Sequence, residues 1–312
     1  MARRAPGGDD RGMDHAPLDR RSFLGASAAA AAGSLALPGS LPSSSPGARP
    51  QDPAAAPKPK SKLKQSVARW IYNDIPLETF CEQCAASGLS AIDLLYAREW
   101  MTPKKFGLEC SMAFGPDSMQ IGRGLNRREM HDQYVKDCET FLPRIADAGI
   151  KNMIVFSGNR GGQSDADGIA NCVEGFKRLA PIAEKAGVTL CFEYLNSKVD
   201  HKDYAFDTMS YGLEVCKAVD SPRVKILYDI YHVQIMEGDV IRTLTDNARW
   251  IGHYHTGGVP GRRDIDDTQE LNYPAICRAI LATGYDGFVS HEFIPKGDKM
   301  AALARAVKLC AV

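Results

Sequence analysis

The chain has 312 residues, of which 44% are hydrophobic and 24% are charged, a composition that suits one large globular domain or two small ones. Basic and acidic residues balance at 38 each, and the part after residue 60 carries 30 basic against 33 acidic residues. The sequence has no basic stripe, which argues against nucleic acid as a partner.

The first 62 residues predict a leader that precedes the folded domain. Arg20 and Arg21 stand before a short alanine-rich apolar run, from Ala26 to Leu37, which is the layout of a secretory signal and resembles the twin-arginine export motif. The run is shorter than the ~18–20 apolar residues of a membrane span. The alternative is a chance Arg-Arg pair before a disordered alanine tract.

A linker follows the signal. Residues 41–62 are rich in Ser, Pro, Ala and Lys and have no periodicity, so they cannot form a core. We therefore expect a signal segment at 1–40, a disordered linker at 41–62 and one domain at 63–312. The mature protein would be exported to the periplasm, with no stable membrane span.

The cysteines give little sign of disulfide bonds or of a zinc site. There are nine, an odd number, in a chain too large to need disulfides. Cys81 and Cys84 have CxxC spacing, but they lie in a helical pattern and no second pair exists, whereas a zinc site needs four ligands. Packing of a helix is the favoured interpretation.

After residue 66, short apolar runs alternate with longer helical patterns. The strands predicted in chain order are Ala68–Tyr72, Ala91–Leu95, Glu109–Phe114, Asn152–Ser157, Thr189–Tyr194, Val224–Asp229, Ile251–His255 and Gly287–Glu292. The helices predicted between them are Leu77–Ala86, Arg98–Phe106, Arg128–Ala148, Asp167–Ala186, Thr208–Val219, Asp239–Asn247, Tyr273–Ala282 and Lys299–Leu309.

This alternation predicts the fold class. Three helices end at a glycine before the next strand, at Gly149, Gly187 and Gly284. Eight strand–helix units in about 250 residues fit a single α/β domain with the (β/α)8 TIM-barrel architecture. An open doubly wound sheet is the alternative, but no GxGxxG follows the first strand.

The last four strands each end in a side chain that can bind a metal. These side chains are Glu193, Asp229, His255 and Glu292, and the carboxyl ends of barrel strands meet at one mouth. Three carboxylates and an imidazole suit one divalent ion, Mn²⁺, Mg²⁺ or Co²⁺. Taken singly, each residue more often has another role, such as a helix cap, a salt-bridge partner or a packing residue.

Two further histidines lie beside these positions. His253 is two residues before His255, so both point to the same face of the strand. We choose His255 as the ligand because it lies nearer the mouth, and expect His253 one layer deeper. His291 is adjacent to Glu292 and should point away from the site.

Four segments resemble hydroxypyruvate isomerase: residues 227–239 (LYDIYHVQIMEGD), 251–262 (IGHYHTGGVPGR), 270–274 (ELNYP) and 284–295 (GYDGFVSHEFIP). More broadly, residues 66–295 are similar to the xylose-isomerase-like sugar isomerase and epimerase barrels. The resemblance implies the same four metal ligands, Glu193, Asp229, His255 and Glu292. Hydroxypyruvate isomerases tend to have Gln in place of His255, and ketose 3-epimerases have His.

The resemblance implies an isomerase that works through an enediolate, an intramolecular oxidoreductase of the aldose–ketose type or an epimerase. Hydroxypyruvate, converted to tartronate semialdehyde, is the substrate it favours. Glu193 and Glu292 would act as the acid/base pair. His232 and Arg262 would bind the substrate, a small sugar or hydroxy-keto acid, with a helix-capping His232 and a solvated Arg262 as alternatives. Lys198 and His201 are weaker candidates.

Other functions stay open at this point. The same barrel suits a ketose 3-epimerase or a sugar lyase or dehydratase. A DNA phosphodiesterase like endonuclease IV would need more histidine ligands and a basic face. An exported sugar-binding protein would need no catalytic carboxylates. The run from Asp264 to Asp267 raises the question of a second metal site, although a solvated acidic loop is favoured. The sequence leaves the oligomeric state open, a homo-oligomer included.

Overall fold

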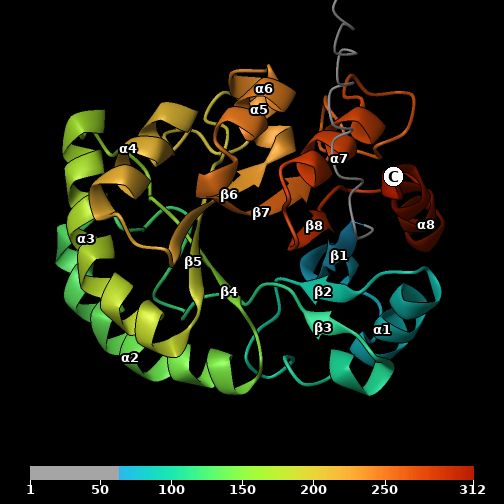
Figure 1. Cartoon of the computed structure of the whole chain (residues 1–312), viewed down its shortest axis with the longest axis horizontal. Helices are drawn as coiled ribbons and strands as arrows, with labels where there is room; N and C mark the ends of the chain where they lie inside the picture. Colours follow the sequence, from blue (N-terminus) through green and yellow to red (C-terminus); the bar gives the residue numbers. More distant parts are fainter. Residues whose placement is uncertain (1–62) are drawn as a thin grey trace, which may run out of the picture. The chain divides into compact units, whose positions relative to one another are not determined.

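The computed structural model describes residues 63–312, in which parallel strands alternate with helices that lie outside them (Figure 1). The predicted signal segment and linker lie outside these residues and stay predictions. The strands are β1 Lys64–Ala68, β2 Ala91–Asp93, β3 Glu109–Cys110, β4 Asn152–Val155, β5 Thr189–Glu193, β6 Val224–Asp229, β7 Ile251–Thr256 and β8 Phe288–His291. The α-helices are α1 Leu77–Ala86, α2 His131–Asp147, α3 Asp165–Ala186, α4 Met209–Val219, α5 Ile230–Met236, α6 Val240–Asp246, α7 Tyr273–Ala282 and α8 Lys299–Cys310.

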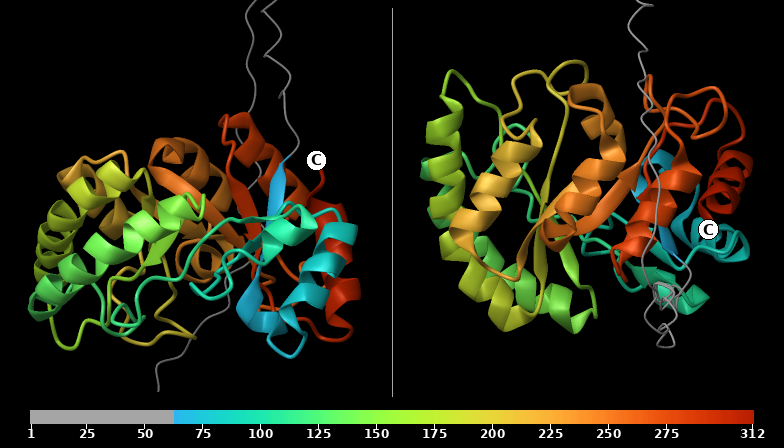
Figure 2. Two further views of the ribbon diagram at one scale, coloured as in Figure 1. Left: turned by 90° about the horizontal axis from the view of Figure 1, so that it is seen from below. Right: turned by 45° about the horizontal axis from the view of Figure 1, so that its top comes forward.

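The strands close into a barrel. Their order is β3-β2-β1-β8-β7-β6-β5-β4, all parallel. The first strand pairs with the last, with Ser66 opposite Ser290, and Figure 2 shows these two ends of the domain side by side. A parallel bridge from Ala113 to Met153 joins the β3 and β4 edges. The predicted (β/α)8 barrel is therefore confirmed.

The core has two layers, because side chains alternate along each strand. On β5, Phe192 points outward and packs against Phe176 of α3 and against Phe206, with ring centroids 5.1 and 4.5 Å apart. Each buried ring of this size stabilises the fold by roughly 1.5–3 kcal/mol. The next residue, Glu193, points into the barrel, so packing of the helices fixes which side chain reaches the interior.

Two predicted elements were wrong. The first strand begins at Lys64, and the predicted strand Ala68–Tyr72 is largely a 3-10 helix over Arg69–Tyr72. Here the Arg69 guanidinium donates to the carbonyls of Tyr72 and Ile75, which tightens the chain into a turn. The predicted helix Arg98–Phe106 is only a 3-10 turn over Pro103–Phe106.

One short helix was not predicted. It is α5, and Asp229 caps it, since its Oδ1 accepts hydrogen bonds from the backbone N–H groups of Tyr231 (2.9 Å) and His232 (3.3 Å). A carboxylate at this position satisfies amides that a helix start leaves free. Asp229 therefore ends β6 and begins α5 at once.

The three predicted helix ends at glycine are confirmed. Gly149, Gly187 and Gly284 have φ of 78°, 72° and 82° at their helix ends. All nine cysteines are buried and free, and Cys81 and Cys84 pack α1 against the core. Within residues 63–312, no helix combines the length and apolarity needed to cross a membrane.

Candidate metal centre and active site

The four predicted ligands meet at the carboxyl end of the barrel. Each of Glu193, Asp229, His255 and Glu292 offers one ligand atom, and these atoms lie within 4.8 Å of one another. His255 Nδ1 is 2.6 Å from Glu292 Oε2, 3.5 Å from Glu193 Oε1 and 4.0 Å from Asp229 Oδ2. All four side chains are buried.

This donor set fits a divalent ion. Ligand atoms around an octahedral or tetrahedral ion with bonds of about 2.1 Å are separated by roughly 3–4 Å, which is close to the spacing here. His255 Nδ1 is buried and makes no hydrogen bond of regular geometry, although Glu292 Oε2 lies 2.6 Å from it. A divalent ion at this point would be shared by the imidazole nitrogen and the carboxylates, which in its absence compete for protons.

A fifth residue, Asp93 at the end of β2, fixes the orientation of the imidazole. Its Oδ2 lies 2.9 Å from His255 Nε2, and its Oδ1 lies 3.3 Å from His253 Nε2. Ser111 donates a hydrogen bond to the same carboxylate. Because ionised Asp93 only accepts, it holds a proton on His255 Nε2, and Nδ1 faces the ligand cluster.

Arg262 enters the cluster from the loop after β7. Its Nη2 donates to Asp229 Oδ2 at 3.0 Å and to Glu292 Oε2 at 2.5 Å. Trp70 donates to the other oxygen, Glu292 Oε1, at 2.6 Å. Both oxygens of Glu292 are thus held by donors, whereas no hydrogen bond holds the side chain of Glu193 among those described.

The electrostatic surroundings separate the two glutamates. Burial raises the pKa of Glu193 to about 7. Burial acts the same way on Glu292, but the charges of Arg262 and His255 outweigh it and lower the pKa of Glu292 to about 2. Burial alone would lower the pKa of His255, yet Glu292 and the other carboxylates raise it well above its ordinary value.

His232 presents one free donor to the site. Its Nδ1 lies 2.6 Å from Asn196 Nδ2 and accepts from the Asn196 backbone N–H at 3.2 Å. Its proton is therefore on Nε2, which is fully buried, has no hydrogen-bond partner and lies 3.5 Å from Asp229 Oδ2. Burial lowers the pKa of His232 well below its ordinary value, so it is a neutral donor.

The structure separates the weaker candidates. His201 lines the cavity above the cluster, with its ring centroid 5.4 Å from that of His232. Lys198 does not reach the cavity; it donates to the carbonyls of Ile235 and Met236 and ties its loop to α5. His291 points elsewhere, toward Gln65 and Thr256.

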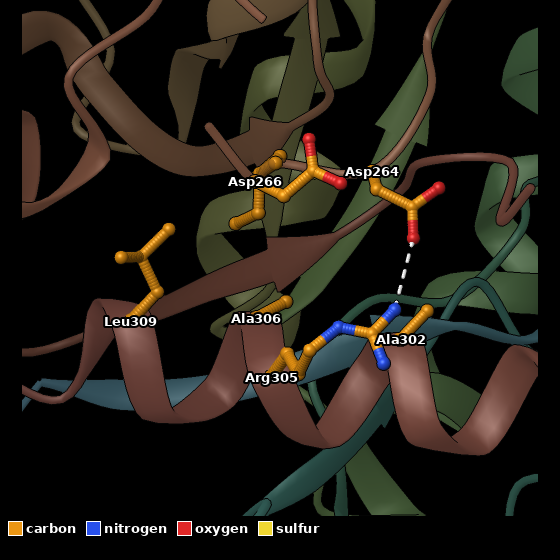
Figure 3. A pocket seen from close by; sticks show the side chains of 7 residues that line it. Asp264, Asp266, Ala302, Arg305, Ala306 and Leu309 are labelled. Carbon is orange, nitrogen blue, oxygen red and sulfur yellow. Dashed lines mark ion pairs between the residues drawn. The ribbon is translucent and has the colours of Figure 1, made fainter. Parts of the chain in front are cut away.

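Asp264 and Asp266 of the acidic run lie over α8, in a pocket whose lining includes none of the four predicted ligands (Figure 3). Asp264 is buried, accepts a hydrogen bond from the Lys296 backbone N–H at 2.8 Å, and faces Arg305 at 3.6 Å. Asp266 accepts from Thr268. The prediction of a solvated loop is wrong for Asp264, which holds its loop against the last helix.

Asp93 and Trp70 were missed in the sequence. A signal for Asp93 was available, because it ends a buried strand as Asp229 does, but the predicted strand ran on to Leu95 and placed Asp93 inside it. Trp70 was assigned to a strand that is a turn. Its contact with Glu292 spans 222 positions in the chain, and no local pattern predicts it.

Known proteins resemble this chain in sequence. The model of the xylose isomerase-like TIM barrel family matches residues 81–310. A 2-oxo-tetronate isomerase from Cupriavidus necator is 35% identical over 134 residues, which are 43% of this chain and 51% of the relative. A protein from Danio rerio that carries a hydroxypyruvate isomerase name is 30% identical over 131 residues, 42% of this chain and 48% of the relative.

A D-psicose 3-epimerase from Ruminiclostridium cellulolyticum is 32% identical over 135 residues, 42% of this chain and 43% of the relative. These matches span about half the length of each relative. Isomerases and epimerases are therefore both among the proteins that this chain resembles. The motifs in residues 227–295 predicted this resemblance.

Two solved structures share the fold. A family 2 AP endonuclease from Brucella melitensis superposes with a TM-score of 0.70 at 22% identity, covering 79% of this chain and 99% of that chain. An IOLI protein with a bound zinc atom superposes with a TM-score of 0.62 at 15% identity, covering 80% and 95%. With the family model matching most of the chain, the protein belongs to the xylose isomerase-like TIM barrel family.

Proposed function

We propose that this protein is a metal-dependent isomerase or epimerase of a small α-hydroxycarbonyl compound. The observation that carries the proposal is the convergence of three carboxylates on the buried His255 Nδ1, with the four ligand atoms within 4.8 Å of one another. Glu193, Asp229, His255 and Glu292 would hold the ion. When bound, Mn²⁺, Mg²⁺ or Co²⁺ supplies positive charge to the two cis oxygens of an enediolate.

The two glutamates have different environments, which suits proton transfer between two carbons or two faces. Glu292 is fixed by Trp70 and Arg262 on its two oxygens. Glu193 lacks such anchors among the described side chains and comes from β5, three strands away in the barrel order. Glu193 would remove the proton next to the carbonyl, and Glu292 would serve on the other side of the substrate.

His232 would hydrogen-bond a substrate oxygen. Its Nε2–H is the free donor of the site, 3.5 Å from Asp229 Oδ2. The bond from Asn196 to Nδ1 fixes this tautomer. Arg262 would lie beside the same oxygens, because its guanidinium already contacts two of the four ligands.

Hydroxypyruvate isomerisation, favoured by the sequence resemblance, and ketose 3-epimerisation, favoured by His255, are two versions of this chemistry. The test common to both is proton exchange. The protein is stripped of metal, reloaded with Mn²⁺ and incubated in D2O with hydroxypyruvate and a panel of ketoses. Metal-dependent loss of a proton NMR signal next to the carbonyl supports the proposal. If bound metal brings no exchange in any of these compounds or in a simple α-hydroxyketone such as 1-hydroxybutan-2-one, the proposal falls.

A further inference from the structure

The two halves of the barrel contribute different chemistry to the cavity above the cluster. This cavity has a volume of about 290 Å³, at the small end of ligand pockets. The late strands β5–β8 supply the charged residues. The opposite wall is apolar and comes from the segments after β1–β4, together with Leu195 after β5: Trp70, Leu94, Phe114, Ile121, Ile154, Phe156 and Leu195.

Among residues 63–312, no spare cation lines the cavity to receive an anion. Its charged lining residues are Glu193, Glu292 and Arg262. The Arg262 guanidinium already faces two carboxylates, at 3.0 and 2.5 Å. A carboxylate on the far end of a substrate would therefore lie against aromatic and aliphatic groups, and burying an unpaired charge there is costly.

Hydroxyl groups on the far end would also lack partners. Apart from the charged residues, His201 is the polar side chain that lines the cavity. The Trp70 indole N–H is used by Glu292. A buried hydroxyl without a hydrogen bond weakens binding by roughly tenfold or more.

We infer that the substrate is a neutral α-hydroxyketone whose carbon chain beyond the reacting oxygens is apolar, rather than a 2-oxo acid or a long polyol. This inference rests on the proposed function and selects within it. The hydroxycarbonyl head lies at the ligand cluster, and the tail lies against Phe114, Ile154 and Phe156. Phe156 and Ile154 are 7% and 2% exposed, so the wall is preformed.

The test compares three compounds that share the head HO–CH2–CO. Their tails are an ethyl group (1-hydroxybutan-2-one), a diol (L-erythrulose) and a carboxylate (hydroxypyruvate). Dissociation constants are measured by calorimetry on the Mn²⁺-loaded protein, and exchange of the C1 protons is followed in D2O. We expect 1-hydroxybutan-2-one to bind at least about tenfold more tightly than either of the others. Equal affinities, or tighter binding of hydroxypyruvate or erythrulose, would overturn the inference.

A pair of variants checks where the tail lies. Ile121 lines the cavity and is 38% exposed, so a lysine there adds a cation at little structural cost. Ile121→Lys should strengthen hydroxypyruvate binding at least about tenfold without helping 1-hydroxybutan-2-one. Ile241→Lys is the control, because Ile241 is 41% exposed on α6 and does not line the cavity. Equal effects of the two variants would overturn the placement.

The two readouts separate this inference from the function on which it rests. Exchange in any of the three compounds supports the function, whichever binds most tightly. Tightest binding of hydroxypyruvate with metal-dependent exchange overturns the inference and leaves the function standing. If 1-hydroxybutan-2-one binds most tightly but no compound exchanges its protons, the result supports the tail assignment and overturns the isomerase proposal.

Discussion

His255 Nε2 donates a hydrogen bond to Asp93 Oδ2 at 2.9 Å, across 162 positions of the sequence. This contact orients the imidazole of the cluster, because it leaves Nδ1 facing Glu193, Asp229 and Glu292. The second carboxylate oxygen of Asp93 lies 3.3 Å from His253. A residue on the second strand thus controls the geometry of a site built by the last four.

Replacing Asp93 should weaken metal binding. Asp93→Asn removes the charge that holds the Nε2–H tautomer, and such changes lower metal affinity by about 10–100-fold. Calorimetric titration with Mn²⁺ measures this directly. Asp264→Asn is the matched control, since Asp264 is also a buried carboxylate and lies over α8 (Figure 3). An unchanged affinity in Asp93→Asn would remove Asp93 from the account.

Replacing Arg262 should destabilise the metal-free protein. Arg262→Gln leaves Asp229 and Glu292 buried without their counter-charge, which costs about 3–5 kcal/mol of unfolding free energy. Mn²⁺ at saturation should recover most of the loss, because the ion then compensates the same carboxylates. Denaturant unfolding with and without Mn²⁺ tests this.

Arg305→Gln is the control for that experiment. Its side chain is 64% exposed and lies 3.6 Å from Asp264, so the change should stay within about 0.5 kcal/mol. A loss in Arg262→Gln no larger than in Arg305→Gln would show that the guanidinium does not neutralise the cluster.

Metal affinity should rise with pH. Burial raises the pKa of Glu193 to about 7. Burial alone would lower the pKa of His255, but the nearby carboxylates, above all Glu292, raise it. Protons then compete with the ion, and apparent Mn²⁺ affinity should rise at least about tenfold per pH unit up to about pH 7. Above that pH the slope should decrease, because Glu193 is then ionised.

The same shift has a consequence for the metal-free fold. The pKa of Glu193 is raised above its ordinary value, so its neutral form contributes stability at low pH that is lost as the pH rises through about 7.

Glu193→Gln should remove one proton from the pH slope of Mn²⁺ binding. A slope that is the same in the variant would assign the competing proton to another group.

Replacing Glu193 should also stop proton transfer. Glu193→Gln keeps the size of the side chain but removes the carboxylate that would carry the proton, and loss of a general base slows such reactions by about 10²–10⁴-fold. Exchange in D2O, measured at Mn²⁺ saturation, separates this effect from weaker metal binding. Exchange that persists at the wild-type rate would assign the base elsewhere.

The sequence predicted those parts of the site that follow from local pattern. Asp229 ends a continuous buried run, V-K-I-L-Y, and such a strand end in a barrel lies at the mouth. The same rule applied to Glu193, His255 and Glu292, and the structure brings all four together. Their role as ligands stays a prediction.

Asp93 could have been predicted by the same rule, but the contacts of Trp70 and Arg262 with the cluster could not. Each depends on a contact between distant segments, and on backbone that departs from regular structure. At Arg69–Tyr72, for example, hydrogen bonds from the Arg69 side chain to backbone carbonyls stabilise a 3-10 turn where a strand was predicted. Arg262 has a positive φ of 56°, which aims a loop residue inward and which no strand or helix pattern indicates.

The most direct test of the central claim is a crystal structure with Mn²⁺, read from its anomalous scattering. The account predicts one peak, about 2.0–2.3 Å from His255 Nδ1 and from one oxygen each of Glu193, Asp229 and Glu292, with Asp93 still bonded to Nε2. A peak elsewhere, or none at saturating Mn²⁺, would contradict the assignment of these four residues as the metal centre.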